Sequence, residues 1–213
     1  MKERPILFSG AMVRAILEGR KTQTRRVVKD PICTNKEIYA DAGLTWYGNF
    51  GLRKPCKFGD IGDRLWVRET AKYKRYGGLW VFDVFDHAEA NVIYEADKES
   101  KYFMLDSDTM KKFKEGKKPS IFMPRWASRI TLEIVSVRVE SLVDISEHDA
   151  KAEGIEQDEN KLFKCYTPKA GWLAIDDPVE SYKTLWDSIN GMGSWYDNPW
   201  VWVIEFKKVE VAK

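Results

Sequence analysis

The last long apolar run, "NPWVWVIEFKKV" at residues 198–209, constrains the fold more than any other segment. Between Trp200 and Phe206 apolar residues occupy odd and even positions alike, so a strand formed here needs cover on both faces. Such a strand lies inside a sheet rather than at its edge. The sequence therefore predicts a sheet in which this late strand is flanked by strands from earlier in the chain.

Earlier segments supply both strands and helices. Apolar residues in "SGAMVRAILEG" (residues 9–19) recur with helical spacing, between a capping Ser9 and a terminal Gly19. "GDRLWVRETA" (62–71) alternates as a strand, and the longer run from Ile130 to Val139 changes phase midway, which is typical of a bulge. Two more helices are predicted in "DISEHDAKAEGI" (144–155) and "DPVESYKTLWDSING" (177–191). The fold class is therefore α+β.

One domain covering residues 1–213 accounts for these elements, because the early and late strands need a common sheet. Two stretches are predicted as insertions, at about 30–57 and about 73–118. The first has scattered Gly, Pro and Asn with little periodicity. The second contains "LWVFDVF" and "ANVIYEA", which we expect to form a hairpin, followed by a charged excursion at 98–118 that could be helical.

The charge pattern points to a local basic patch. A net charge of +2 argues against a chain that coats nucleic acid or an anionic membrane along its whole surface. The densest patch is "EGRKTQTRRV" (18–27) with the residues just after it, where five cations fall within ten positions: Arg20, Lys21, Arg25, Arg26 and Lys29.

Cysteine and histidine usage predicts no metal and no cofactor. The three cysteines are far apart, no CxxC pair occurs, and only two histidines are present, so no zinc site of ordinary spacing can be written. We expect reduced thiols in a cytoplasmic protein. The sequence contains no run of eighteen apolar residues, so it predicts no membrane-spanning helix. The first ten residues, "MKERPILFSG", lack the apolar segment of a signal peptide.

Within the basic patch, "LEGRKTQTRR" (17–26) resembles the G-x-K-x-x-T-x-R signature of ASCH domains, matching it at Gly19, Lys21, Thr24 and Arg26. Four longer stretches are similar to the longer ASCH-like proteins of bacteriophages and prophages: "RPILFSGAMVRAILEGRKTQTRRVV", "GDRLWVRET", "PSIFMPRWASRI" and "NPWVWVIEF". This resemblance implies a PUA-like fold, a small β-barrel with flanking helices, here carrying the two insertions.

The resemblance also implies a function. ASCH and PUA-like barrels bind RNA or modified nucleobases beside the first helix, and some small ASCH enzymes remove the acetyl group from N4-acetylcytidine. Carried over, the nucleophile is Thr24, the base is Lys21, and a glutamate from a later short helix, here Glu153, relays the proton. Residues three apart in a regular strand point to opposite faces, so this arrangement needs a bulge or turn between Lys21 and Thr24.

Two further groups are candidates from the residues themselves. Glu69 continues the strand face that Leu65 and Val67 mark as interior. It is either the proton relay in place of Glu153 or a structural acid paired with neighbours of Arg68 or with Arg129. Trp126, in an irregular run between two arginines, is either a core residue or a shelf for a nucleobase. The predicted nucleic-acid-binding set is Arg20, Arg25, Arg26, Arg125, Trp126 and Arg129.

Three classes of function remain open at this point. The first is an amidohydrolase acting on a modified cytidine, which needs the Lys–x–x–Thr pair and a carboxylate. The second is a non-catalytic RNA- or nucleic-acid-binding module, or a ribonuclease, using the same basic cleft. The third is a phage structural or host-interaction protein on a borrowed fold, for which the insertions would matter more than the motif.

Overall fold

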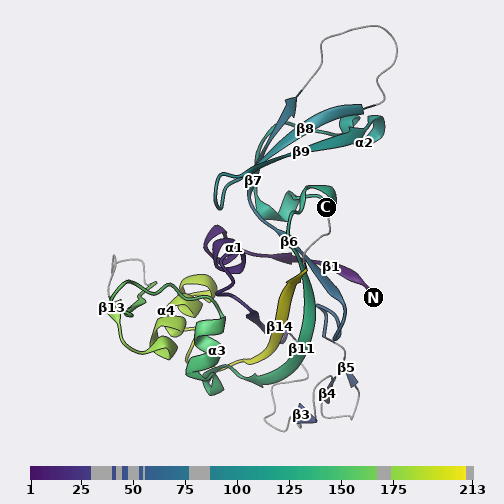
Figure 1. The fold of residues 1–213 in the computed structure, drawn as a ribbon. Helices are drawn as coiled ribbons and strands as arrows, with labels where there is room; N and C mark the ends of the chain where they lie inside the picture. The colour runs from purple at the N-terminus through teal and green to yellow at the C-terminus, as the bar shows by residue number, and fades with distance from the viewer. Residues whose placement is uncertain are drawn as a thin grey trace, which may run out of the picture. The chain divides into compact units, whose positions relative to one another are not determined.

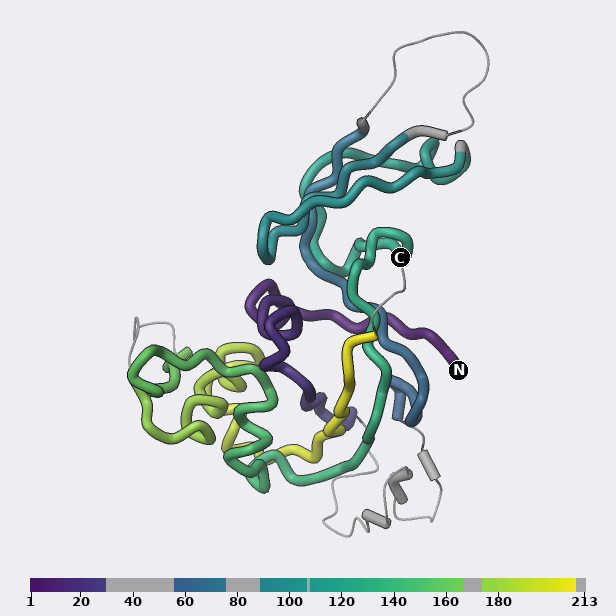
Figure 2. The backbone as a smooth tube through the Cα atoms, in the orientation of Figure 1, coloured from purple at the N-terminus to yellow at the C-terminus, as the bar shows by residue number. Residues whose placement is uncertain are grey.

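A computed structural model describes residues 1–29, 40–41, 45–47, 53–54, 56–76, 87–166 and 174–209; the remaining residues are grey in Figure 2. The chain divides into two compact units. The first comprises Met1–Arg4, Ala15–Leu65 and Leu132–Lys213, and the second comprises Pro5–Arg14 and Trp66–Thr131. The sequence predicts one domain, and the insertion that it places at 73–118 falls inside the second unit.

The largest sheet contains five strands in the order β1 (Glu3–Leu7), β6 (Arg64–Arg68), β11 (Thr131–Ser141), β14 (Trp200–Val209) and β2 (Gln23–Val27). Strand β14 therefore lies between β11 and β2, and its run beside β11 is plain in Figure 1. Residues 201–204 are all buried, so both faces of β14 are covered. The prediction of an interior C-terminal strand is confirmed.

The α+β class is confirmed, since several sheets are combined with a few helices. Within the described residues the five-stranded sheet is open, because β1 and β2 stand at the two ends of its order. No closed barrel forms in that part of the chain. In β11 the buried positions change from even to odd between Ile134 and Val137, at the predicted change of phase.

The helices of the first unit begin and end near the predicted positions. Helix α3 (Glu147–Ala152) starts at Ser146, whose side chain accepts a hydrogen bond from the Asp149 amide, and ends before Gly154, whose φ is +83°. Helix α4 (Pro178–Asn190) is capped by Asp177 and has its proline in the first turn. These helices pack with β14 around a cluster that includes Tyr182, Trp186 and Trp195.

Helix α1 (Gly10–Leu17) is followed by Gly19 at φ +77°, as the sequence predicts. The division between the two units falls within this helix, after Arg14. Strand β2 follows it.

The second unit contains a four-stranded sheet in the order β10 (Gly116–Lys118), β7 (Ala71–Tyr76), β8 (His87–Tyr94) and β9 (Ser100–Asp106), with the short helix α2 (Ser107–Lys111). Figure 1 shows α2 at one end of β8 and β9. Two 3-10 turns follow, η2 (Ser120–Phe122) and η3 (Arg125–Ala127), and one face of the sheet packs on η3 and on Met123 through a cluster that includes Tyr73 and Tyr94. "ANVIYEA" contributes to β8, whereas its predicted hairpin partner "LWVFDVF" lies outside the described residues.

The remaining elements are short. A 3-10 turn η4 (Leu142–Asp144) follows β11, and β12 (Phe163–Lys164) pairs with β13 (Ala174–Ile175). In the first predicted insertion, β3 (Ala40–Asp41), β4 (Thr45–Tyr47) and β5 (Arg53–Lys54) form a three-stranded sheet. In the part of the chain that the structure describes, no helix has both the length and the apolar character needed to cross a membrane.

Candidate functional site

Lys21 and Glu153 form a direct contact in the first unit. The main chain positions both residues, because the Lys21 amide donates to the Ala15 carbonyl and Lys21 forms an antiparallel bridge with Glu153. The Lys21 Nζ then donates to the Glu153 carbonyl oxygen and to its Oε2, each at 2.8 Å. A lysine of the basic patch and the residue that ends α3 therefore form one ion pair.

This ion pair is shielded from solvent. The Lys21 side chain is 0% exposed and that of Glu153 4%. Burial lowers the pKa of Lys21, and the Glu153 carboxylate opposes that effect while the charges of Arg26 and Arg25 add to it. A lysine in this setting loses its proton more readily than an exposed one, which is a property that a general base requires.

Arg25 connects the same carboxylate to two others. Its Nη1 donates to Glu153 Oε1 at 3.3 Å, and its Nη2 donates to Asp149 Oδ2 at 3.0 Å and to Glu140. The Arg25 side chain is 0% exposed and its guanidinium lies 5.9 Å from the ring centroid of Tyr182. Arg25 therefore holds three carboxylates at fixed positions beneath the protein surface.

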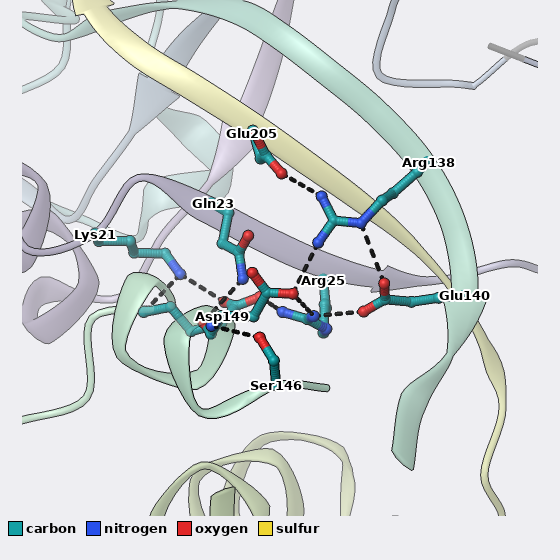
Figure 3. A network of polar contacts seen from close by, with 9 residues as sticks. Lys21, Gln23, Arg25, Arg138, Glu140, Ser146, Asp149 and Glu205 are labelled. Carbon is teal, nitrogen blue, oxygen red and sulfur yellow. Dashed lines mark hydrogen bonds and ion pairs between the residues drawn. The ribbon is translucent and has the colours of Figure 1, made fainter. Parts of the chain in front are cut away.

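Arg138 extends the network outward. Its Nη2 donates to Asp149 Oδ2 at 2.8 Å and its Nε to Glu140 Oε2 at 3.1 Å, and it also pairs with Glu205 of β14. Figure 3 shows Arg138 between Glu205, Glu140 and Asp149, with Gln23 and Arg25 of β2 and the nearby Lys21 on the other side of Asp149. Because Arg138 is 31% exposed, the charged network runs from the surface to the buried lysine.

Thr24 is not directed to this network. Gln23 donates to the Asp149 carbonyl and Arg25 contacts Asp149 and Glu153, so both side chains reach α3 and the residue that follows it. Thr24 lies between Gln23 and Arg25 in β2, which is regularly paired with β14. Because successive side chains of a strand point to opposite faces, the Thr24 side chain points away from the face that carries Gln23 and Arg25. The bulge or turn needed to bring Thr24 toward Lys21 is absent from β2, whose register with β14 is continuous from Gln23 to Val27.

Glu69 belongs to the second unit and is a structurally paired acid. Arg129 binds its carboxylate with two hydrogen bonds, from Nε at 2.9 Å and from Nη2 at 3.0 Å. The same guanidinium also contacts Asp97 and Glu99 and lies 4.0 Å from the ring centroid of Tyr94. Of the two interpretations of Glu69, the pairing with Arg129 is confirmed, and its role as a proton relay stays a prediction.

Two arginines predicted to bind nucleic acid are buried. The side chains of Arg25 and Arg129 are 0% and 3% exposed, and their guanidinium groups form ion pairs with carboxylates. The structure places neither where a phosphate group could reach it. The sequence predicts Glu69 as a partner of Arg129, whereas the acids that neutralise Arg25 lie more than a hundred residues away in the chain and local patterns do not reveal them.

The other predicted contacts differ in exposure. Arg20 is exposed, pairs with Glu18 and donates to the Gly154 carbonyl at 3.1 Å. Arg26 is half-buried opposite Trp202, and burial lowers its pKa. Arg125 is exposed and lies 5.9 Å from the ring centroid of Trp66.

Trp126 is part of the core of the second unit rather than a free shelf. Its ring meets those of Tyr73 and Phe103 edge-on, with centroids 6.1 and 5.4 Å apart, and Phe113 lies 6.4 Å away. Trp126 is only partly exposed. The interpretation of this residue as a core aromatic is the one that the structure supports.

Five residues of the network were not predicted from the sequence: the buried Gln23 and the outer residues Arg138, Glu140, Asp149 and Glu205. One signal was available, because Arg138 and Glu140 are two residues apart in a strand and so share a face. Asp149 takes part in the capping of α3 through its amide, which donates to Ser146 Oγ. Its carboxylate is nevertheless shared with Arg25 and Arg138.

Among the described residues no cluster of three or more His, Cys, Asp or Glu side chains is arranged to hold a metal ion. Comparison with known proteins finds no matching family model, no matching curated protein and no matching solved structure. The resemblance to ASCH domains therefore rests on the motif residues, and the contact between Lys21 and Glu153 is the structural observation that bears most directly on it.

Proposed function

We propose that this protein is a PUA-like, ASCH-domain amidohydrolase that acts on an acylated nucleobase such as N4-acetylcytidine. One observation carries the proposal. The lysine of the ASCH-like motif and the glutamate expected from a later short helix lie 2.8 Å apart in a buried ion pair. Their separation in sequence is 132 residues, so local chain geometry does not account for the contact.

The pair has the chemistry that amide hydrolysis needs. A base must take a proton from the nucleophile as it adds to the carbonyl carbon, and an acid must give a proton to the departing nitrogen when the C–N bond breaks. Burial favours the neutral form of Lys21, which accepts the first proton. Glu153, hydrogen-bonded to Lys21, passes a proton toward the leaving amine. The products are acetate and cytidine.

Two nucleophiles fit this scheme, the Thr24 hydroxyl and a water molecule. The regular pairing of β2 turns Thr24 away from the face that carries Gln23 and Arg25, so the geometry favours water. A mechanism through Thr24 would need β2 to change its register or twist when substrate binds. Experiment separates the two, because only the mechanism through Thr24 is abolished by removing the Thr24 hydroxyl group.

The test is release of cytidine from N4-acetylcytidine by the wild-type protein and three variants. Lys21→Met and Glu153→Gln should each lower kcat by about 10²-fold or more, the usual contribution of an acid–base group. Thr24→Val should retain activity if water attacks and lose it if Thr24 does. Lys151→Met is the matched control, since Lys151 lies on α3 with a side chain 52% exposed. Circular dichroism shows whether each variant folds.

A non-catalytic nucleobase- or RNA-binding module is the second candidate. The observation in its favour is the complete burial of Lys21, because buried ion pairs also occur as purely structural features. Absence of turnover at high enzyme concentration, with the wild-type protein folded, would overturn the amidohydrolase and leave this module. A ribonuclease would instead cleave RNA under the same conditions.

A further inference from the structure

A second concentration of positive charge lies in the second unit, far from the ASCH-like motif in sequence. It lies on β7, on β10 and on the residues between α2 and β10. Residues 71–75 and 111–118 contain eight cations and one acid, Glu115. We call these cations the basic edge: Lys72, Lys74, Arg75, Lys111, Lys112, Lys114, Lys117 and Lys118.

Sheet pairing forces like charges together at this edge. β10 pairs with β7 so that Lys117 stands directly opposite Lys72. Like charges directly opposite each other across two strands destabilise a sheet. Burial lowers the pKa of Lys118, and the nearby charge of Lys114 lowers it further. The chain therefore accepts an electrostatic cost here that neutral side chains would avoid.

Acidic side chains compensate only part of this charge. Lys117 pairs with Glu95 at 3.2 Å, and Lys111 pairs with Asp108 at 3.3 Å. Lys72, Lys74, Lys112 and Lys114 have no ion-pair partner within the part of the chain that the structure describes. The second unit as a whole also carries more positive than negative charge, with fourteen Lys and Arg residues and ten Asp and Glu residues.

The basic edge is built on ordered structure rather than on a tail. Lys118 Nζ lies 4.7 Å from the ring centroid of Tyr73 and 5.7 Å from that of Phe113. Tyr73 is buried and Phe113 half-buried, so the aromatic residues of the edge face inward while its other lysines are exposed. A surface that inserts into lipid needs exposed apolar side chains beside its cations. Residues 71–75 and 111–118 expose charged side chains, whereas the exposed apolar residues Ile121 and Phe122 follow in η2, so the vesicle measurement described below is needed to separate lipid from nucleic acid.

We propose that the basic edge binds the phosphodiester backbone of a nucleic acid. A rigid row of uncompensated lysines attracts a polyanion, and binding releases counterions from it. The anion would neutralise Lys72, which faces Lys117 across the two strands, and the positive charge that Glu95 leaves uncompensated at the remaining lysines. Contacts to phosphate position a strand without reading its sequence. This site is separate from Lys21 and Glu153, and the proposal does not require that the protein hydrolyse anything.

The experiment measures fluorescence anisotropy of a labelled single-stranded RNA over a range of salt concentrations, using the full chain. Lys72→Gln/Lys117→Gln removes the opposed pair. Lys101→Gln/Lys208→Gln is the control, because it removes the same charge from exposed positions on β9 and β14. The Lys72/Lys117 variant should bind on the order of 10-fold more weakly at low salt. Its plot of log K against log salt should flatten by about 1.5, from the loss of two phosphate contacts.

A thermal melt provides a second readout that does not depend on RNA. Relief of the like-charge pair should raise the Tm of the Lys72→Gln/Lys117→Gln variant, which also proves that it folds. The control variant should match the wild-type protein in RNA affinity and salt slope. Equal affinities and slopes for both double variants would overturn the proposal. So would binding to phosphatidylserine vesicles without binding to single-stranded RNA, single-stranded DNA or duplex.

Discussion

At the scale of single residues, the pair of Lys21 and Glu153 illustrates how unequal the two halves of a buried ion pair can be. Glu153 is shared, because Arg25 holds its other oxygen, whereas the Lys21 ammonium depends on Glu153 for its neutralising charge. Removing one member of a buried pair leaves the other charge uncompensated. The damage should therefore depend on which member is removed.

We expect Glu153→Leu to lower the free energy of unfolding by about 3 kcal/mol or more, since it removes the carboxylate that the buried Lys21 ammonium contacts, while Arg25 keeps Glu140 and Asp149. Lys21→Met should cost less, because Arg25 still neutralises Glu153. Urea denaturation measures both. Glu180→Gln, at the exposed pair with Lys183, is the control and should cost less than about 1 kcal/mol. Equal losses for the two buried variants would contradict this account of the shared carboxylate.

Two buried tyrosines in the second unit differ in whether their hydroxyl group makes a hydrogen bond, so they allow the contribution of one such bond to stability to be measured. The Tyr94 hydroxyl donates to the Ala127 carbonyl at 2.9 Å, whereas the Tyr73 hydroxyl has no hydrogen-bond partner among the described residues. Tyr94→Phe should lower the unfolding free energy by about 1 kcal/mol. Tyr73→Phe should leave it unchanged or raise it, because an unsatisfied buried hydroxyl is removed. A larger loss for Tyr73→Phe than for Tyr94→Phe in urea melts would show that Tyr73 is bonded in solution.

At the scale of elements, the glycines that follow two helices differ in how tightly their surroundings are packed, and one of them lies against Lys21. Gly19 follows α1 and Gly154 follows α3, and both have positive φ. A Cβ at Gly154 would lie 2.8 Å from Lys21 Cβ and 2.9 Å from Ala15 Cβ, while one at Gly19 would meet nothing within 4 Å. Gly19→Ala should therefore cost about 1 kcal/mol for the backbone alone. Gly154→Ala should cost roughly 2 to 4 kcal/mol, since overpacking adds to that strain.

Thermal denaturation of the two alanine variants measures this difference. Because the clash involves Lys21, Gly154→Ala should also impair any activity that depends on Lys21, whereas Gly19→Ala should not. Equal shifts in Tm would mean that α3 moves freely relative to Lys21.

The elements themselves were largely predictable, and their pairing was not. Periodicity located β14, α1, α3 and α4, because it depends on residues close in sequence. The five-strand order places β14 between β11 and β2, and this order joins Arg138 to Glu205 across 67 residues. A reading of local patterns has no access to such contacts. The same limit explains why Arg25 looked like an exposed cation and why only a resemblance suggested the partner of Lys21.

At the scale of the whole molecule, the net charge of +2 is the sum of two units whose net charges have opposite signs. The second unit has fourteen cations and ten acids, so the first has the remaining twenty-one cations and twenty-three acids. In the first unit the network around Arg25 and Arg138 joins cations and acids in ion pairs, whereas eight of the fourteen cations of the second unit lie at the basic edge. Net charge assigned to each unit is thus more informative about partners than the value for the chain.

Each unit also contains a tyrosine that should make the protein sensitive to alkali. Burial raises the pKa of Tyr73 in the second unit and of Tyr166 in the first to about 12, from an ordinary value of 10.0. Between those values the unfolded chain loses these protons while the folded protein retains them, so stability is full below pH 10 and falls as the pH rises toward 12. The slope should approach about 1.4 kcal/mol per pH unit for each tyrosine. Urea denaturation at several pH values between about 10 and 12 measures this fall in the free energy of unfolding. Tyr73→Phe should reduce its slope by the contribution of one tyrosine. An unchanged slope in that variant would mean that Tyr73 ionises normally in the folded protein.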